Sequence, residues 1–201
     1  MTKKIYIFGA SGHGKVVADI AKNQGYEVAA FIDDDNSKNE FCGFGCVRLK
    51  DIPQNSLVAL AIGSNSARAK VAQKILDAKH NLATLIHSSA VISQSSSIDI
   101  GSVVMPLAII NADAKIGKGA IINSGAIVEH DCTLGDFVHI CPKAALAGNV
   151  NVRALSWIGI SSCVIQGKNI GKSVIVGAGA VVINDIEDGL TIVGVPAKKF
   201  V

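Results

Sequence analysis

Two histidines, one of them beside carboxylates, are the side chains of this sequence best suited to proton transfer. His130 lies between Glu129 and Asp131, and His139 follows in the same half of the chain. Imidazole titrates near neutral pH and can accept a proton from a substrate, and a nearby carboxylate raises its basicity and fixes its tautomer. Because neighbours on an extended strand point to opposite faces, the sequence leaves open which carboxylate contacts His130.

A glycine-rich turn near the N-terminus has the composition of a phosphate-binding segment. Residues 9–14 read Gly-Ala-Ser-Gly-His-Gly. Their spacing, G-x-x-G-x-G, differs from the dinucleotide fingerprint G-x-G-x-x-G. Backbone N–H groups at a helix N-terminus still suit a diphosphate, although a plain strand-to-helix turn accounts equally well for these glycines. His13 lies inside the turn and is a candidate contact for a phosphate or a sugar.

The residues around this turn predict a small α/β domain. Apolar segments predict strands and 3.6-residue spacing predicts helices, with strands at 4–8, 27–32 and 57–62 and helices at 15–25 and 67–79. The second strand ends at Asp33-Asp34. Strand, glycine turn, helix, strand and acidic end are typical of a Rossmann-type fold, so residues 1–86 are assigned to a Rossmann-like domain.

A six-residue repeat dominates residues 87–201. Every sixth residue from Ile92 to Val182 is Ile, Leu or Val, and the positions two residues earlier are mostly small. This period is typical of a hexapeptide β-helix, in which three units close one coil and the aliphatic side chain points to the axis. About five coils are expected. The residue after the aliphatic one is often Gly or Asn, and we interpret these residues as corners with positive φ.

Composition excludes several classes of protein. The formal net charge is +3, from 19 Lys and Arg against 16 Asp and Glu, which is too weak for nucleic-acid binding as the main task. No apolar run reaches the roughly 18 residues of a membrane span, and no cleavable signal pattern is present. The five cysteines lack framework spacing. We therefore expect a cytoplasmic protein with reduced thiols, no membrane span and no nucleic-acid partner.

Together these motifs resemble the NeuD/PglD family of sugar acyltransferases. The resemblance covers essentially the whole chain and rests on the glycine-rich turn, Asp33-Asp34, Ala61-Ile62-Gly63, Glu129-His130-Asp131, the hexapeptide repeat and the Val-Gly-Val-Pro-Ala-Lys segment at 193–198. The hexapeptide pattern alone is shared by many acyltransferases and some carbonic anhydrases, so the combination is the specific signal. Within the family, the nearest match is to members that N-acetylate a UDP-4-amino-4,6-dideoxy sugar, forming UDP-N,N'-diacetylbacillosamine.

The resemblance implies a left-handed β-helix, a homotrimer, and acetyl-CoA bound as co-substrate between neighbouring β-helices, with no metal. It implies that His130 is the catalytic base and Asp131 its acidic neighbour, where close relatives carry Glu. It also implies that His139, Ile160 and Ala178 line the acetyl-CoA site. Ala178 replaces a Gly typical of the motif, which affects a backbone contact only if φ must be positive there.

The resemblance also implies that the small domain holds the nucleotide sugar. The residues concerned are Ser11, Gly12, His13, Asp33, Asp34 and Gly63. Asn123 is a further candidate for a hydrogen bond to the substrate, although an ordinary turn role explains it equally well.

The predicted reaction is therefore direct acetyl transfer from acetyl-CoA to the 4-amine of a UDP-linked amino sugar, with His130 as general base. Acetyltransferases for GDP-perosamine or for a sialic-acid hydroxyl are the alternatives within the class. A metal-dependent hydratase of the carbonic-anhydrase type needs three histidines on zinc, and the repeat between Ile92 and Val182 supplies only His130 and His139. A non-catalytic scaffold that binds nucleotide sugars is the remaining alternative.

Overall fold

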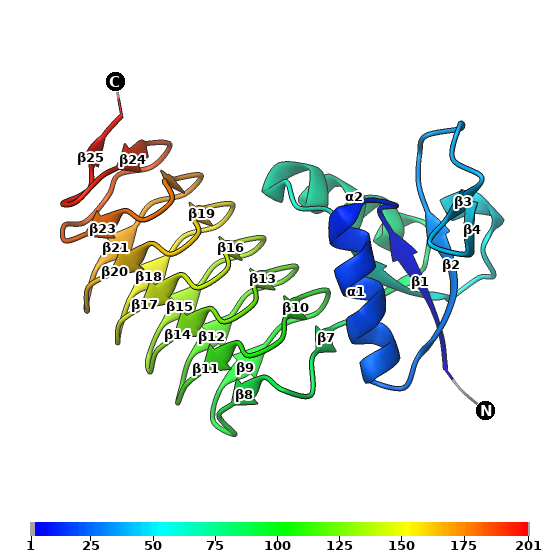
Figure 1. Ribbon diagram of the computed structural model, residues 1–201, viewed down its shortest axis with the longest axis horizontal. Coiled ribbons are helices and arrows are strands. Elements are labelled where there is room, and N and C mark those ends of the chain that lie inside the picture. The colour runs from blue at the N-terminus through cyan, green and yellow to red at the C-terminus, as the bar shows by residue number, and fades with distance from the viewer. Residues whose placement is uncertain (1–2, 201) are drawn as a thin grey trace. The chain divides into compact units, whose positions relative to one another are not determined.

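The computed structural model describes residues 3–200, which divide into two compact units between Ser88 and Ser89 (Figure 1). The first unit is an α/β domain and the second is a solenoid of short parallel strands. The predicted combination of a Rossmann-like domain and a left-handed parallel β-helix is confirmed. Within residues 3–200, no helix combines the length and apolar character that crossing a bilayer requires.

A six-stranded sheet in the order β3-β4-β2-β1-β5-β6 forms the centre of the first unit. The strands are β1 (Lys4–Phe8), β2 (Glu27–Ile32), β3 (Glu40–Phe41), β4 (Phe44–Val47), β5 (Leu57–Leu60) and β6 (Asn81–Leu82), and β7 (Leu85–Ile86) ends the unit. Only the β3–β4 hairpin is antiparallel. The chain order reverses at β1 and β5, and open α/β sheets bind ligands at the carboxyl ends of strands beside such a point.

Two helices connect these strands, and both begin earlier than the sequence pattern predicts. Helix α1 (Gly12–Asn23) joins β1 to β2, and α2 (Asn65–Asp77) joins β5 to β6, while a short 3₁₀ turn, η1 (Leu49–Asp51), precedes β5. The first turn of α1 is made of the glycine-rich segment itself, where no apolar period is visible. The Ser64 hydroxyl caps α2 by accepting a hydrogen bond from the Ala67 N–H.

The solenoid has three faces, each a parallel sheet of two-residue strands. The histidine face contains β10 (Val103–Val104), β13 (Ile121–Ile122), β16 (His139–Ile140), β19 (Trp157–Ile158), β22 (Ile175–Val176) and β24 (Thr191–Val193), to which β25 (Lys198–Lys199) adds antiparallel. The apolar face contains β8 (Val91–Ile92), β11 (Ile109–Ile110), β14 (Ile127–Val128), β17 (Ala145–Leu146), β20 (Cys163–Val164) and β23 (Val181–Val182). The polar face contains β9 (Ser97–Ile98), β12 (Lys115–Ile116), β15 (Thr133–Leu134), β18 (Asn151–Val152) and β21 (Asn169–Ile170).

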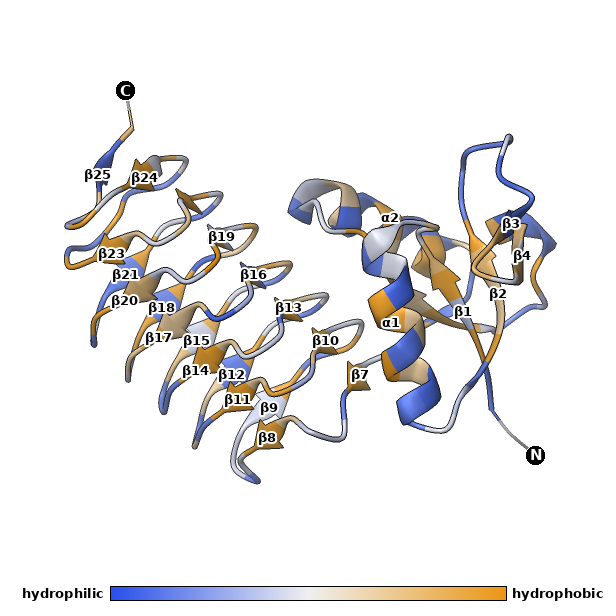
Figure 2. Ribbon diagram, viewed as in Figure 1, coloured by the Kyte–Doolittle hydropathy of each residue, from blue (hydrophilic) through white to orange (hydrophobic). Residues whose placement is uncertain are grey.

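The second residue of each of these two-residue strands points inward and stacks on the equivalent residue one coil away. The predicted ladder of Ile92, Ile110, Val128, Leu146, Val164 and Val182 is confirmed by the strand register. Strands β8 to β22 make five complete coils, and β23, an isolated bridge from Ile186 to Ile170, and β24 form a sixth. Figure 2 shows hydrophobic and hydrophilic segments alternating along the coils. This alternation keeps the aliphatic core continuous along the axis.

The corner conformations differ from the sequence interpretation. Positive φ falls three residues after the inward aliphatic residue, as at Asp113, Asp131, Asn149 and Gly167 on one corner, and not on the Gly or Asn directly after it. Those glycines serve close packing between coils. A Cβ on Gly117 would lie 2.7 Å from the Gly135 carbonyl carbon, so a side chain would force the coils apart.

Gly14 and Gly12 provide a matched test of the packing under the glycine-rich turn. A Cβ on Gly14 would lie 2.2 Å from the Gly9 carbonyl oxygen, whereas a Cβ on Gly12 would meet nothing within 4 Å. We expect Gly14→Ala to lower the free energy of unfolding by roughly 1–3 kcal/mol and Gly12→Ala to leave it unchanged or slightly raised. Thermal unfolding followed by helical circular dichroism measures both. Equal stability of the two variants would contradict this account.

Candidate active site

His130 and Asp131 form a hydrogen-bonded pair on an exposed corner of the solenoid. Nδ1 of His130 lies 2.7 Å from Oδ2 of Asp131. The left-handed conformation of Asp131, with φ of 61°, turns its carboxylate back toward the preceding ring. A carboxylate only accepts hydrogen bonds, so Nδ1 carries a proton and Nε2 has the lone pair whenever the ring is neutral. The hydrogen bond to Asp131 and the charges of Asp131 and Glu129 raise the pKa of His130.

Gly148 makes room for the His130 ring. It occupies the same position one coil later, and a Cβ on Gly148 would lie 2.5 Å from both Cε1 and Nε2 of His130. The His130 carbonyl accepts a hydrogen bond from the Asn149 N–H, which fixes the backbone beneath the ring. Gly148 belongs to none of the motifs found in the sequence, although its spacing of one coil from His130 is the signal that identifies it.

A groove of about 350 Å³ on the histidine face brings together four of the residues singled out in the sequence. Asn123, His139, Ile160 and Ala178 all line it, with Trp157 and Pro142 among the other lining residues. Ile160 and Ala178 lie one coil apart, and the Ile160 carbonyl accepts a hydrogen bond from the Gly179 N–H. Asn123 therefore lies with the predicted coenzyme residues, and His130 is not part of the groove lining.

The hydrogen bonds of Asn123 determine the tautomer of His139. Oδ1 of Asn123 accepts a hydrogen bond of 2.8 Å from the Ser124 N–H, which leaves Nδ2 facing Nε2 of His139 at 3.0 Å. An amide NH₂ only donates, so Nε2 of His139 accepts and the ring is neutral. The Trp157 ring packs against it at a centroid distance of 4.3 Å. Of the two histidines, His130 therefore has the Nε2 lone pair that a general base requires.

In the first unit, the two adjacent aspartates have different environments. Asp33 accepts hydrogen bonds from the Ala10 N–H at 3.0 Å, the Asp35 N–H at 3.0 Å and Lys38 Nζ at 2.9 Å. Lys38 also donates to the Ala10 carbonyl. Burial alone raises the pKa of Asp33, but these hydrogen bonds outweigh it and hold the pKa below its usual range. Asp33 thus clamps the glycine-rich turn, whereas Asp34 is exposed and pairs with Lys74.

Within the glycine-rich turn, His13 lies close to a buried arginine, Arg68. Arg68 is fully buried and donates hydrogen bonds to the carbonyls of Ile62 and Gly63 and to the Asn65 side chain. Burial and the charge of Arg68 lower the pKa of His13 to about 4, so its imidazole is neutral at physiological pH. Nε2 of His13 is buried and has no hydrogen-bond partner among the described residues.

The backbone of the predicted nucleotide segments remains accessible. Ser11 and Gly12 are exposed and Gly63 is half-buried. Arg68 holds the Gly63 segment through the carbonyls of Ile62 and Gly63. This role was not predictable, because nothing in a helical pattern distinguishes an arginine that turns back to the preceding loop from a solvated one. Lys38 was missed as well, since nothing in a polar loop distinguishes a lysine that contacts the turn from a solvated one.

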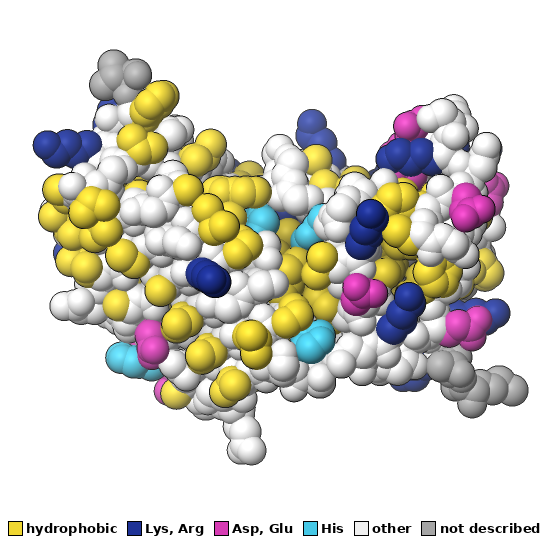
Figure 3. Space-filling model, in the orientation of Figure 1, with side chains coloured by type: hydrophobic (Ala, Val, Ile, Leu, Met, Phe, Trp, Pro, Cys, Tyr) yellow, Lys and Arg dark blue, Asp and Glu magenta, His cyan; other side chains and the backbone are white. Residues whose placement is uncertain are grey.

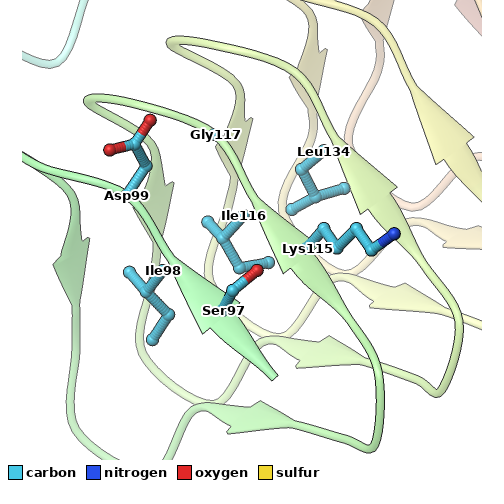
Figure 4. Close-up of a pocket in the computed structure, with 7 residues that line it drawn as sticks. All are labelled: Ser97, Ile98, Asp99, Lys115, Ile116, Gly117 and Leu134. Atoms are coloured by element: carbon cyan, nitrogen blue, oxygen red, sulfur yellow. The ribbon is translucent and has the colours of Figure 1, made fainter. Parts of the chain in front are cut away.

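Other groups of the chain add no further chemistry to these sites. Cys132 is buried, its thiol donates to the Ala147 carbonyl, and burial raises its pKa, which makes it a poor nucleophile. In residues 3–200, no three His, Cys, Asp or Glu side chains converge in a way that would hold a metal ion. A depression of about 390 Å³ on the polar face has Asp99 and Lys115 at opposite sides (Figure 4). None of the predicted site residues lines it.

Comparisons with known proteins match this arrangement over the whole chain. The family model described as the PglD N-terminal domain matches residues 4–75. The crystal structure of PerB from Caulobacter crescentus, in complex with CoA and GDP-perosamine, is 39% identical, covers 100% of this chain and 99% of its own, and has a TM-score of 0.93. The chain belongs to the NeuD/PglD family of sugar acyltransferases. The resemblance found in the sequence is thereby confirmed.

Two further NeuD/PglD relatives differ in how much of the chain they match. The acetyltransferase domain of PglB from Neisseria gonorrhoeae FA1090 is 36% identical over 99% of this chain and 100% of its own, with a TM-score of 0.92. The UDP-N-acetylbacillosamine N-acetyltransferase of Bacillus subtilis is 38% identical over 111 residues, 51% of each protein. The matched region thus spans about half the length of this curated relative.

Asp131→Asn tests the pairing that distinguishes His130 within this NeuD/PglD chain. The variant removes the carboxylate that stabilises the imidazolium, so we expect the pKa of His130 to fall toward the ordinary value of about 6.5. NMR titration of the imidazole Cε1–H measures it, with His130→Ala used to assign the signal. Glu129→Gln should lower the pKa less, because Glu129 acts only through its charge. An unchanged pKa in Asp131→Asn would refute the pairing.

Proposed function

We propose that this chain, a sugar N-acetyltransferase of the NeuD/PglD family, transfers the acetyl group of acetyl-CoA to the 4-amine of a nucleotide-linked 4-amino-4,6-dideoxy sugar. The observation that carries the proposal is the His130–Asp131 pair, which presents an Nε2 lone pair on an exposed corner. The relatives act on, or were solved with, two kinds of acceptor. A UDP-linked sugar is the expected acceptor here, and GDP-perosamine, bound in the PerB structure, is the second candidate.

In this mechanism, His130 acts as the base of a direct transfer. The neutral sugar amine attacks the thioester carbonyl, and Nε2 of His130 takes the proton that the nitrogen loses as the N–C bond forms. The C–S bond then breaks, and the proton passes from Nε2 to the departing thiolate. Asp131 holds Nδ1–H throughout and stabilises the imidazolium, which is the usual role of a carboxylate behind a catalytic histidine.

The groove on the histidine face is the proposed site of acetyl-CoA. It offers apolar contacts from Trp157, Pro142 and Ile160 beside two polar groups, the Asn123 and His139 side chains. A neutral His139 suits an uncharged pantetheine arm, which carries amide and thioester groups. Ala178 has no positive φ, so its replacement of the family's Gly introduces no backbone strain.

The outward residues of the solenoid support a homotrimer. On the apolar face they are Val91, Ile109, Ile127, Ala145, Cys163 and Val181, whereas on the polar face they are Ser97, Lys115, Thr133, Asn151 and Asn169. Figure 3 shows hydrophobic side chains over much of the solenoid face in view. Apolar surface of this kind marks interaction sites. Packing the apolar face of one copy on the histidine face of the next is a heterologous contact, and a rotation of one third of a turn between copies closes such contacts into a trimer.

A thiol-release assay tests the proposed reaction directly. Acetyl-CoA would be incubated with UDP- and GDP-linked 4-amino-4,6-dideoxy sugars and with sialic acid. We expect turnover with the UDP-linked sugar, and a loss of roughly 10²–10⁴-fold in kcat for His130→Ala. Turnover with GDP-perosamine alone would show that the acceptor is the GDP-linked sugar and would leave the proposed mechanism unchanged. Equal activity in His130→Ala would refute the proposed base.

Gly148→Ala tests whether the position of the His130 ring matters to the reaction. The added methyl would overlap Cε1 and Nε2 of His130, so the ring must rotate away while every catalytic group remains present. We expect kcat to fall by roughly tenfold to a hundredfold, as for a misplaced catalytic group, with an unchanged melting temperature. Full activity in this variant would show that the ring does not act from the observed position.

A further inference from the structure

An ion pair between Asp34 and Lys74 lies at the carboxyl ends of the strands in the first unit. Both carboxylate oxygens of Asp34 accept hydrogen bonds from Lys74 Nζ, at 2.8 and 2.9 Å. Asp34 follows β2, whereas Lys74 belongs to α2, which follows β5. Lys74 Nζ lies 5.6 Å from the centre of the Phe8 ring at the end of β1. The pair therefore spans the ends of the strands on both sides of the point where the strand order reverses.

The Asp34–Lys74 pair keeps unused hydrogen-bonding capacity on both members. An ammonium group has three N–H donors, and two of them point to Asp34, so one is free. A carboxylate has about four lone-pair sites and gives two of them to Lys74. Because both side chains are about half exposed, a donor and an acceptor lie side by side and are open to a ligand. Asp33 is less suited to this part, because its oxygens already bond to Ala10, Asp35 and Lys38 and its side chain is largely buried.

We propose that Asp34 and Lys74 together read the base of the nucleotide sugar through its ring N–H and the adjacent carbonyl. Asp34 accepts the ring N–H, and Lys74 donates to the carbonyl oxygen. Uracil at N3–H and O4, and guanine at N1–H and O6, present this order. Cytosine and adenine present the reverse, a ring nitrogen acceptor beside an amino donor. The pair therefore selects uracil and guanine nucleotides over cytosine and adenine nucleotides, which makes Lys74 a specificity-determining residue.

This inference rests on the proposed function, because it assumes that a nucleotide occupies this edge of the sheet. A single donor–acceptor pair of this kind suits both UDP-linked and GDP-linked acceptors, the two kinds that are named for the relatives. An ammonium that merely neutralised the diphosphate would not distinguish bases. That difference separates base reading from simple charge attraction.

Binding of free nucleotides, without acetyl-CoA, tests the inference. Isothermal titration would give Kd values of the full-length protein for UDP, GDP, CDP and ADP. We expect UDP or GDP to bind roughly tenfold or more tightly than CDP and ADP, as for a paired hydrogen-bond contact to a base. Lys74→Met keeps the length of the side chain and removes its charge. In this variant the Kd of the preferred nucleotide should rise while the Kd of CDP does not, so the ratio of the two Kd values falls below about threefold.

The matched control is Lys70→Met, an exposed lysine one turn earlier in α2, which should keep the preference. Asp34→Asn should strengthen the binding of CDP relative to that of UDP, because a carboxamide can donate a hydrogen bond to N3 of cytosine. Equal weakening of all four nucleotides in Lys74→Met would overturn the inference and leave a charge role. A wild-type protein that binds all four alike would also overturn it. A wild-type protein that binds none of them would instead refute the nucleotide site of the proposed function.

Discussion

The backbone hydrogen bonds that join each coil to the next fix the position of every functional group in the solenoid. They impose a constant register of one coil, so any residue lies beside the residue that occupies its position in the coil before and after. Pro142, Ile160 and Ala178 line one groove for this reason. The same register places Gly148 beneath the ring of His130. The site is thus assembled by periodicity, without long-range packing of separate segments.

The corner of each coil adds the second constraint, a residue in the left-handed conformation. On the corner that carries the catalytic pair, Asp113, Asp131, Asn149 and Gly167 all have positive φ. Asp and Asn tolerate this conformation better than most residues, which explains their use there. At Asp131 the conformation has a chemical effect as well, because it returns the carboxylate to the preceding histidine. A structural requirement of the coil and an electrostatic requirement of the base are met by the same residue.

The period of six, the ladder of inward residues and the Rossmann-like order of elements were all predictable, because each follows from a pattern of apolar residues. Contacts that depend on local backbone geometry were not. Extended-strand geometry left the partner of His130 undecided, and only the φ of Asp131 resolves it. Asp33 and Asp34 cannot be distinguished in the sequence, yet Asp33 accepts hydrogen bonds that hold the glycine-rich turn, whereas Asp34 is exposed. The β3–β4 hairpin went unpredicted because its strands, of two and four residues, are too short to show an apolar pattern.

The solenoid is a linear array, in which each coil is bonded only to the coils above and below it. His130 lies on a coil with complete neighbours on both sides, whereas Ala178 lies directly before the sixth and last coil. Fraying that begins at the C-terminal end of such an array reaches the groove of His139 and Ala178 before it reaches the catalytic corner. Amide protons should therefore exchange fastest at the C-terminal coils and more slowly toward the N-terminal ones. The protein should lose its capacity to bind the coenzyme before the hydrogen bond between His130 and Asp131 is disrupted.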